Sequence, residues 1–485
     1  MAGVRTLPAQ AGGVLMRDGH VVVRPDGAGR AAQRMPFFAL VVFIALLIPA
    51  FFHLGTLLMT PSRLLFLLLI PLLLLKLLGK QYGRVTYIDW MILFHMSWFT
   101  LSVFVNASAG VAVTYTGVNT VILLGGYLAG RAAIRDLDQF LGFVRFFAFV
   151  LTLSLPFILY ETLTGHLTIP KLIEMIPGLT SNKDVQYPRR MGLDRVQFVF
   201  VHPIHFGFFC SLSVGLFFVA MKQQMGSFRL WAQTAVLALA TFFSLSSGPF
   251  LSMVIQFLLI MWLYVMRNLQ RPWMTLAWLC LGLYVVLEVA SNGPALYVII
   301  TKLAFNSGTA NARRVLLDYG IDQVIATPVF GIFKRPWNLP PWMTGSLDNY
   351  WLGLAVAFGF PTFFSQFAAF ILAIVAIAKR DFPKGSTLDR VRTAWVISMI
   401  SATLTLGTVF VWSEIASFMF FFFAAGLWMM DAEVEAGDAS LPEAGPERPR
   451  GPQYTRFGPS RQRPLAQGAI PRAHGRASGP AHGRL

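Results

Sequence analysis

Charged side chains are scarce in this chain. Asp, Glu, Lys and Arg together make up 13% of its 485 residues, whereas hydrophobic residues make up 56% and the mean hydropathy is +0.62. An average soluble domain devotes about one quarter of its residues to charge. So apolar a composition exceeds what a soluble core needs, and it is typical of a protein that crosses a lipid bilayer many times.

Several motifs that carry chemistry in other proteins are missing. The two cysteines, Cys210 and Cys280, both fall inside apolar stretches, so they give no disulfide framework and no sign of thiol chemistry. The sequence has no Walker loop, no His/Cys cluster at metal-ligand spacing and no G-x-S-x-G elbow. Nucleotide hydrolysis, metal chemistry and serine hydrolysis are therefore unsupported, and we expect neither a metal nor a cofactor.

Apolar runs near the spanning length of about 20 residues recur along the chain. They predict an all-α polytopic membrane protein with about twelve transmembrane helices, in a membrane domain of residues 36–430. The expected spans are 37–58, 61–78, 88–105, 111–130, 140–160, 199–221, 230–247, 249–266, 273–290, 347–378, 393–411 and 414–430.

Lys and Arg alternate between the connections, which predicts the orientation, because cytoplasmic loops carry the excess of positive charge. Both termini and every second connection are expected in the cytoplasm. Two longer segments fall on the opposite side: a first periplasmic loop at 161–198, and a large loop at 291–346 between the ninth and tenth helices. Both are rich in arginine, so their charges need another explanation. The basic connections hold Lys76, Lys80, Arg84, Arg131, Arg135, Lys222, Arg229, Arg267, Arg271, Lys379, Arg380, Lys384, Arg390 and Arg392.

The two ends of the chain differ from the apolar middle. Residues 1–35 are polar and lack a cleavage site, which predicts a retained cytoplasmic tail. Residues 431–485 are rich in Pro, Gly and Arg, which predicts a disordered cytoplasmic tail drawn to anionic lipid headgroups. No nucleic-acid-binding module accompanies the basic residues, so a nucleic-acid partner is not expected.

The first outer segment ends in "YPRRMGLDRVQFVFVHPIHFGF". Arg189, Arg190 and Arg195 either contact lipid headgroups or bind an anionic ligand, and the side of the membrane favours the second, since arginine has no topological reason to lie there. His202 and His205 stand at the start of the sixth expected helix. They are either interfacial residues or part of a binding site, and the sequence leaves both open.

The second outer segment contains "NSGTANARRVLLDYG", residues 306–320. Thr309 or Asn311 is expected to cap a helix with Arg313 and Arg314 in its first turn. A helix amino end is already partly positive, so two arginines there favour a bound anion such as phosphate. The alternative is a surface pair compensated by acidic residues of the same helix, Asp318 or Asp322.

Asp348 and Asn349 follow directly, at the start of the tenth expected helix. Asp348 or Ser346 either caps this helix or, for Asp348, forms a carboxylate that accepts a proton from a hydroxyl. The sequence does not rank these alternatives. Trp337 and Trp342 of the same loop are expected to stack on sugars or to lie at the membrane interface.

Taken together, these stretches resemble the bacterial O-antigen and exopolysaccharide polymerases, which are related to the O-antigen ligases. The resemblance spans roughly residues 185–365 and rests on the order of "RRMGLDRVQFVFVHPIHFG", "FFSLSSGPFLSM", "ARRVLLDYGIDQVIATPVFGIF" and "SLDNYWLGLAVAFGFP". Ligases and many polymerases have Arg after Ser in the Ser-rich turn, where this chain has Ser247, Gly248 and Pro249. Ligases commonly have His before Asn, where this chain has Asp348, as in exopolysaccharide polymerases.

The resemblance implies a metal-independent glycosyltransferase of the bacterial inner membrane that works at the periplasmic face. It would use polyprenyl-pyrophosphate-linked oligosaccharides and work beside a repeat-unit flippase and a chain-length co-polymerase. We expect Arg313 and Arg314 to bind the donor pyrophosphate and Asp348 to act as general base. The expected substrate-binding residues are Arg190, Arg195, His202, His205, Asn349 and Tyr350.

Two other functions share much of this pattern. An O-antigen ligase would transfer the glycan to lipid A core. A transporter or flippase of lipid-linked sugars would share the apolar composition, but it usually keeps ionisable residues near the bilayer midplane. Here Arg145 and Glu288 lie toward the ends of the expected helices. The sequence therefore ranks the polymerase first, the ligase second and the transporter third.

Overall fold

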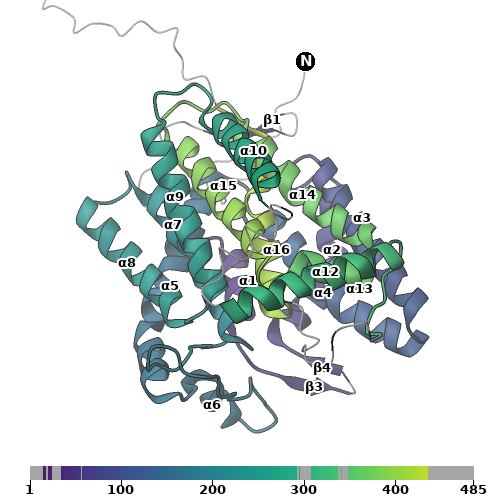
Figure 1. The fold of residues 1–485 in the computed structure, drawn as a ribbon. Coiled ribbons are helices and arrows are strands. Elements are labelled where there is room, and N and C mark those ends of the chain that lie inside the picture. The colour runs from purple at the N-terminus through teal and green to yellow at the C-terminus, as the bar shows by residue number, and fades with distance from the viewer. Residues whose placement is uncertain are drawn as a thin grey trace, which may run out of the picture. The chain divides into compact units, whose positions relative to one another are not determined.

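The computed structural model describes residues 15–17, 20–23, 34–55, 57–291, 294, 307–336, 340 and 348–434. The compact unit of the chain, residues 1–437, is mostly helical (Figure 1). The helices are α1 (Phe37–Leu47), α2 (Pro61–Leu78), α3 (Tyr87–Asn106), α4 (Ala109–Ala133), α5 (Leu137–Thr164), α6 (Thr168–Glu174), α7 (Pro203–Met221), α8 (Ser227–Phe243), α9 (Ser247–Val265), α10 (Pro272–Ala290), α12 (Ser307–Ala326), α13 (Tyr350–Phe358), α14 (Phe360–Ala378), α15 (Thr387–Thr405) and α16 (Glu414–Ala424).

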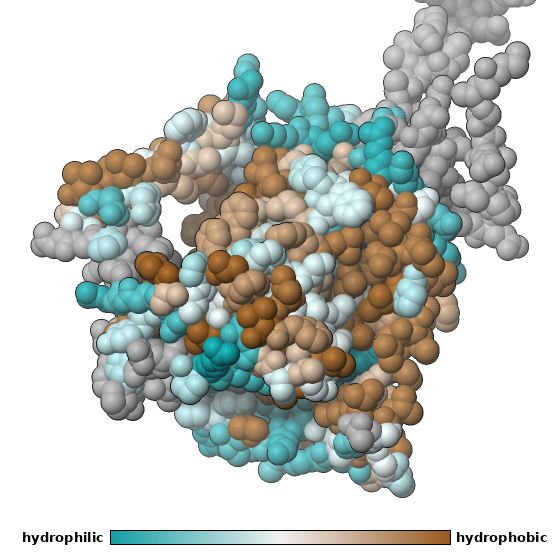
Figure 2. All heavy atoms as spheres, turned by 90° about the vertical axis from the view of Figure 1, so that its right-hand side faces the viewer, coloured by the Kyte–Doolittle hydropathy of each residue, from teal (hydrophilic) through white to brown (hydrophobic). Residues whose placement is uncertain are grey.

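Within the described residues, eight helices are long and apolar enough to cross a membrane: α2, α3, α4, α5, α7, α9, α10 and α14. Figure 2 shows brown apolar side chains over the middle of the face it draws, with teal hydrophilic side chains above and below. An apolar band of this kind is typical of a membrane-spanning surface, because the hydrocarbon core of a bilayer excludes unpaired polar groups. The helical class and the multi-pass membrane character are thus confirmed, whereas the number of twelve spans stays a prediction.

Three of the apolar runs are not single helices, so the prediction of one uninterrupted helix for each was wrong. In the first, α1 ends at Leu47 just before Pro49, and a hairpin of β3 (Phe52–Leu54) and β4 (Leu57–Met59) follows. The tenth run breaks between α13 and α14, where Gly359 has a positive φ of 86°. The last run leaves α16 at Ala424 and continues as a 3-10 helix, Leu427–Met430.

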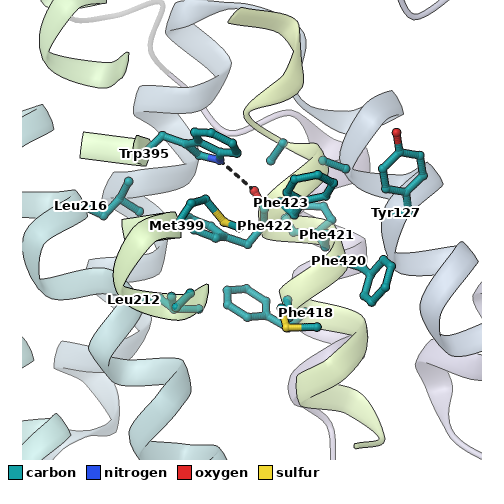
Figure 3. Packing of buried hydrophobic residues seen from close by; sticks show 14 of the residues in the cluster. Tyr127, Leu212, Leu216, Trp395, Met399, Phe418, Phe420, Phe421, Phe422 and Phe423 are labelled. Atoms are coloured by element: carbon teal, nitrogen blue, oxygen red, sulfur yellow. Dashed lines mark hydrogen bonds between the residues drawn. The ribbon is translucent and has the colours of Figure 1, made fainter. Parts of the chain in front are cut away.

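The phenylalanine-rich helix α16 lies in the core of the bundle (Figure 3). It packs on α4 at Gly126 and Gly130, where a Cβ atom would collide with backbone carbonyl oxygens of α16. On its other side the Trp395 indole N–H of α15 donates to the Phe422 carbonyl oxygen at 3.2 Å. Small residues that let helix backbones approach are the usual packing device within membranes. This packing fixes the direction of α16 through the bundle.

One end of the bundle gathers several basic connections, and we call it the basic end. There β2 (His20–Val23) pairs antiparallel with β1 (Leu15–Arg17) and parallel with β5 (Ala432–Val434), so the segments before α1 and after α16 lie side by side. Arg380, after α14, donates to the Ala432 carbonyl, and Arg131, at the end of α4, donates to the Arg84 carbonyl at 2.8 Å. The described parts of both terminal segments therefore lie at one end.

Candidate functional site

A cavity of about 380 Å³ lies where α7, α9 and α13 begin and where the α15–α16 connection passes. This connection precedes α16, whose far end leads to β5, so the cavity and the basic end lie at opposite ends of α16. Four residues singled out in the sequence come together here from three separate segments. The cavity is lined by Arg190, Arg195, Ile204, Ser246, Ser247, Gly248, Arg313, Asp348, Thr408 and Val409.

Two of the arginines reach the Ser-rich turn between α8 and α9. The Arg190 Nη1 donates to the Leu245 carbonyl oxygen at 2.7 Å, and the Arg195 Nη2 donates to the Ser246 hydroxyl at 2.9 Å. The Arg195 guanidinium also lies over the Tyr187 ring, 5.5 Å from its centroid. Arg195, which comes from a different segment, thus places a guanidinium group directly beside this turn.

The segment that carries these arginines is anchored to the end of α5. The buried Glu161 carboxylate accepts the backbone N–H groups of Gln197 and Phe198 at 2.7 and 3.1 Å. Phe198 has a positive φ of 54°, a conformation that a bulky residue keeps only where its surroundings hold it. The Arg189 side chain, by contrast, is 64% exposed and pairs with the Asp194 carboxylate at 2.8 Å. It is not among the residues that line the cavity. This anchoring fixes where Arg195 projects.

The amino end of α9 forms another wall. Ser246 is the N-cap but its side chain makes no capping bond, and Ser247 and Gly248 line the cavity. Gly248 is required here, because a Cβ atom would collide with the Val409 side chain. A helix amino end carries a partial positive charge and unpaired N–H groups, both of which favour an anion.

Helix α12 carries Arg313 to the cavity, although it begins earlier than predicted. It starts at Ser307, so Thr309 and Asn311 lie inside the helix and the expected cap at either residue was wrong. Arg313 and Arg314 therefore lie beyond its first turn. Arg313 is half-buried and lines the cavity, whereas Arg314 is exposed and is absent from the lining. The two adjacent arginines are thus not equivalent.

The Pro-x-x-Gly turn after α12 locks that helix to the break between α13 and α14. The N–H groups of Ile332 and Phe333 donate to the last carbonyls of α13, at 3.0 and 2.7 Å, and the Phe360 N–H donates to the Pro328 carbonyl at 2.7 Å. Gly331 and Gly359 both have positive φ, and a Cβ on either would strike the facing backbone. The turn thereby places Arg313 relative to Asp348.

Asp348 lies at the cavity rim, exposed, and its charge acts on both Arg195 and Arg313. It is not the cap of the following helix. Asn349 is that cap, since its side chain accepts the Leu352 N–H at 3.0 Å. Ser346, Trp337 and Trp342 lie outside the described residues. The capping alternative for Asp348 was therefore wrong, and the amide oxygen of Asn349 is already engaged within the protein.

Of the two histidines, His202 is the one nearer to the cavity arginines. Its Nδ1 accepts the Ile204 N–H at 3.0 Å and so caps α7. Burial and then the nearby Arg195 charge lower the pKa of His202 to about 4, which keeps it neutral at pH 7. His205 is buried and its Nε2 lies 3.3 Å from the Phe410 carbonyl oxygen.

Tyr350 is also buried. Its hydroxyl donates to the Gln366 side-chain oxygen at 3.0 Å, and its N–H donates to the Leu406 carbonyl at 2.8 Å. Neither His205 nor Tyr350 is among the cavity-lining residues. Both residues contact the backbone of the α15–α16 connection, which forms one wall of the cavity. Neither side chain reaches the cavity itself.

The charge balance of the cavity favours an anion. Among the lining residues that the structure describes, three guanidinium groups, those of Arg190, Arg195 and Arg313, accompany one carboxylate, that of Asp348. Burial lowers the pKa of Arg195 to about 10, with the neighbouring Arg190 adding to the effect, and burial also lowers the pKa of Arg313. With a pKa of about 10, Arg195 stays charged near neutral pH. Guanidinium forks match phosphate oxygens in pairs, so the arrangement suits a phosphate or pyrophosphate.

The wall formed by the α15–α16 connection could not be predicted from residue patterns. The α15–α16 connection, residues 406–413, contributes Thr408 and Val409 to the lining and carries no charge before Glu414. Among the described residues, no group of three or more His, Cys, Asp or Glu is placed to hold a metal ion. Comparison of the chain with protein-family models and with curated proteins finds no match.

Proposed function

We propose that the protein is a polymerase of lipid-linked oligosaccharide repeat units in exopolysaccharide or O-antigen biosynthesis. It would transfer the growing glycan from polyprenyl pyrophosphate to the next lipid-linked repeat unit. The observation that carries this proposal is the convergence of Arg190, Arg195, Arg313 and Asp348 with the amino end of α9 around one cavity. The sequence resemblance supplies the class of substrate, and the charge balance of the cavity agrees with it.

The chemistry fits these groups. A hydroxyl of the acceptor sugar attacks the anomeric carbon of the donor glycan, and the bond from that carbon to the pyrophosphate oxygen breaks. The electron pair leaves with the pyrophosphate, whose growing negative charge meets the three arginines and the α9 amino end. Asp348 accepts the proton of the attacking hydroxyl. Fixed guanidinium groups can supply this stabilisation, because they need no reorganisation as the charge develops.

The orientation follows from the two ends of the bundle. Several connections rich in Lys and Arg gather at the basic end, and such connections belong in the cytoplasm. The cavity lies at the other end of α16, so it would face the periplasm of a bacterial inner membrane. Pairing of β2 with β5 agrees with both termini on one side and with an even number of crossings, such as the twelve predicted.

The first test is polymerisation by the purified protein. The full chain in nanodiscs is incubated with the lipid-linked repeat unit of its host, and the glycan products are sized. We expect a ladder that grows by whole repeats. If the glycan instead moves to added lipid A core without forming a ladder, the protein is a ligase and the polymerase proposal fails.

Asp348→Asn tests the base. The variant should lose about 10²- to 10⁴-fold in the rate of polymer growth, since a positioned base contributes that range. Because Asn349 and not Asp348 caps α13, the start of that helix should be kept in the variant. Inorganic pyrophosphate should bind at least as tightly as to the unaltered protein, because a negative charge has been removed from the rim. Full polymer synthesis by Asp348→Asn would show that Asp348 is not the base.

One observation favours a transporter as the second candidate. Helices α13 and α14 form a helix broken at Gly359, and broken helices often line the substrate path of transporters. The carbonyls at this break, however, are occupied by the turn after α12 and do not face the cavity. A flipping assay with fluorescent lipid-linked sugars in proteoliposomes separates the two. Transbilayer movement without glycan growth would favour the transporter.

A further inference from the structure

A strip of aromatic rings extends from the cavity across the amino end of α7. The Tyr187 ring, which lies beneath the Arg195 guanidinium, packs edge-on against the His202 ring with their centroids 4.8 Å apart. The Trp412 ring comes next, 6.3 Å from His202 and 4.0 Å from His205. Trp412 belongs to the same α15–α16 connection as the cavity-lining residues Thr408 and Val409. The strip is therefore continuous with the phosphate-binding groups.

Trp412 differs from Trp98, Trp351 and Trp395 in its indole N–H, and it is more exposed than the buried Trp351 and Trp395. It is 42% exposed, and its N–H has no hydrogen-bond partner among the residues that the structure describes. Trp98, Trp351 and Trp395 instead donate to backbone carbonyls at 3.0, 2.8 and 3.2 Å. An exposed ring with an unused donor beside a polar cavity offers an apolar face and one hydrogen bond to a ligand.

The backbone holds Trp412 in place. Ser413, the next residue, has φ 59° and ψ −139°, which is a strained conformation for a residue other than glycine. Arg63 of α2 maintains it, donating to the Ser413 hydroxyl at 3.2 Å and lying 3.7 Å from the Glu414 carboxylate. The Phe410 carbonyl is in turn held near His205. An exposed ring that is fixed in this way loses little freedom when a ligand binds, which favours binding.

We propose that Trp412, with His202 and Tyr187 beside it, forms a sugar-binding subsite for the sugar attached to the bound pyrophosphate. The C–H face of a pyranose would lie on the indole ring, and the indole N–H would donate to a sugar hydroxyl. This subsite rests on the proposed function, because it takes the sugar of the same lipid-linked substrate. It assigns the α15–α16 connection a role in recognising sugar, separate from the role of the arginines in recognising phosphate.

The test separates sugar from phosphate by using two probes with the full chain in nanodiscs. One probe is polyprenyl pyrophosphate without sugar. The other is the same lipid with a sugar attached through a C-glycosidic bond, which cannot be transferred, prepared with glucose, galactose or N-acetylglucosamine. At least one sugar-bearing probe should bind the unaltered protein about 3- to 10-fold more tightly than the sugar-free probe. Trp412→Ala should abolish that gain and leave binding of the sugar-free probe unchanged.

Two further variants make the result specific. Trp412→Phe keeps an aromatic face and should restore part of the gain. Trp90→Ala removes a tryptophan of comparable exposure, 59%, next to Asp89 at the basic end, and should leave the gain intact. If Trp90→Ala keeps the gain, then removing just any exposed tryptophan does not alter sugar binding.

The outcomes distinguish the two proposals. If the unaltered protein does not bind sugar-free polyprenyl pyrophosphate, the proposed function fails together with the subsite. If it binds that probe but no sugar adds affinity, or if Trp412→Ala keeps the whole gain, the subsite is overturned while the proposed function stands. An equal loss of affinity for both probes would show that Trp412 is an interfacial anchor and would also overturn the subsite.

Discussion

Arg131 near the basic end and Arg195 at the cavity are both withdrawn from solvent, but their surroundings differ. Arg131 is 2% exposed, and its Nε lies 3.1 Å from the carboxylate of Asp89, which is fully buried. The same carboxylate accepts the Tyr127 hydroxyl at 2.6 Å and the Thr86 N–H at 2.6 Å. Around Arg131, charge is matched one to one and the space is filled.

Arg195 faces a different balance. It shares its cavity with Arg190 and Arg313, and one carboxylate serves all three. Its Nη2 donates to a neutral hydroxyl, that of Ser246, and about 380 Å³ of space lies beside it. Buried ion pairs such as that of Arg131 serve to hold a fold together, whereas an excess of one sign around open space indicates a ligand of the other sign. This difference separates a scaffold arginine from a candidate binding arginine.

The largest expected effect comes from changing one cavity arginine. Arg313→Lys should reduce the rate of polymer growth by about 10²- to 10³-fold, because lysine keeps the charge but loses the planar fork that engages two phosphate oxygens. Expression and melting temperature should stay normal, since Arg313 faces a cavity. The measurement is the glycan ladder from purified protein.

Arg314→Lys is the matched control for that experiment. The neighbouring side chain has the same chemistry and helix but is exposed and does not line the cavity. It should keep polymer growth within about threefold of the unaltered protein, as expected for a surface residue away from the site. If both variants lose polymer growth equally, the position of Arg313 in the cavity does not explain its effect.

Changes to the Asp89–Arg131 pair near the basic end should alter the stability of the protein and not its binding of pyrophosphate. Asp89→Asn leaves the buried Arg131 without its counter-charge, which should cost about 3–5 kcal/mol of unfolding free energy. The melting temperature in detergent should fall clearly, while the affinity of the surviving folded protein for inorganic pyrophosphate should not change. Replacing both partners, as Asp89→Leu with Arg131→Met, should recover much of the loss. A stable Asp89→Asn variant with weakened pyrophosphate binding would contradict the division between the two regions.

The sequence predicted the class of fold and several of the cavity residues for a physical reason. Arg190, Arg195, Arg313 and Asp348 stand out because charge is rare in this chain, and the positive-inside rule does not account for arginine in the two loops that were predicted on the outer side. Arg313 and Arg314 could not be separated in this way. Their difference in exposure depends on how α12 packs against α13, which residue spacing alone leaves open.

The remaining features depend on contacts between distant segments. Ser246 and Thr408 are neutral residues with no local pattern, and they become part of the site only because α7, α9 and the α15–α16 connection meet. The break at Gly359 was hidden inside a continuous apolar run, since hydropathy does not register a single positive φ. Tyr350 was expected to bind substrate, yet in the helix that starts there its hydroxyl turns toward Gln366.

The smallest expected effect, and the most direct measure of the unbalanced charge, is the pH response of His202. Its pKa in the folded protein is about 4, below the usual value of 6.5, because of burial and the Arg195 charge. Between these values the unfolded chain binds a proton that the folded protein does not, so falling pH removes stability across this window. His202→Asn keeps a capping side chain for α7 and removes the titrating group.

The melting temperature of the unaltered protein should therefore fall more steeply from pH 6.5 to 4.5 than that of His202→Asn. Inorganic pyrophosphate should reduce this extra slope, because an anion at the cavity offsets the Arg195 charge and lets His202 accept a proton more readily. Arg195→Gln should reduce the slope in the same direction without any ligand. If Arg195→Gln and added pyrophosphate both leave the slope of the unaltered protein unchanged, the Arg195 charge does not act on His202, and the electrostatic argument for an anion site fails.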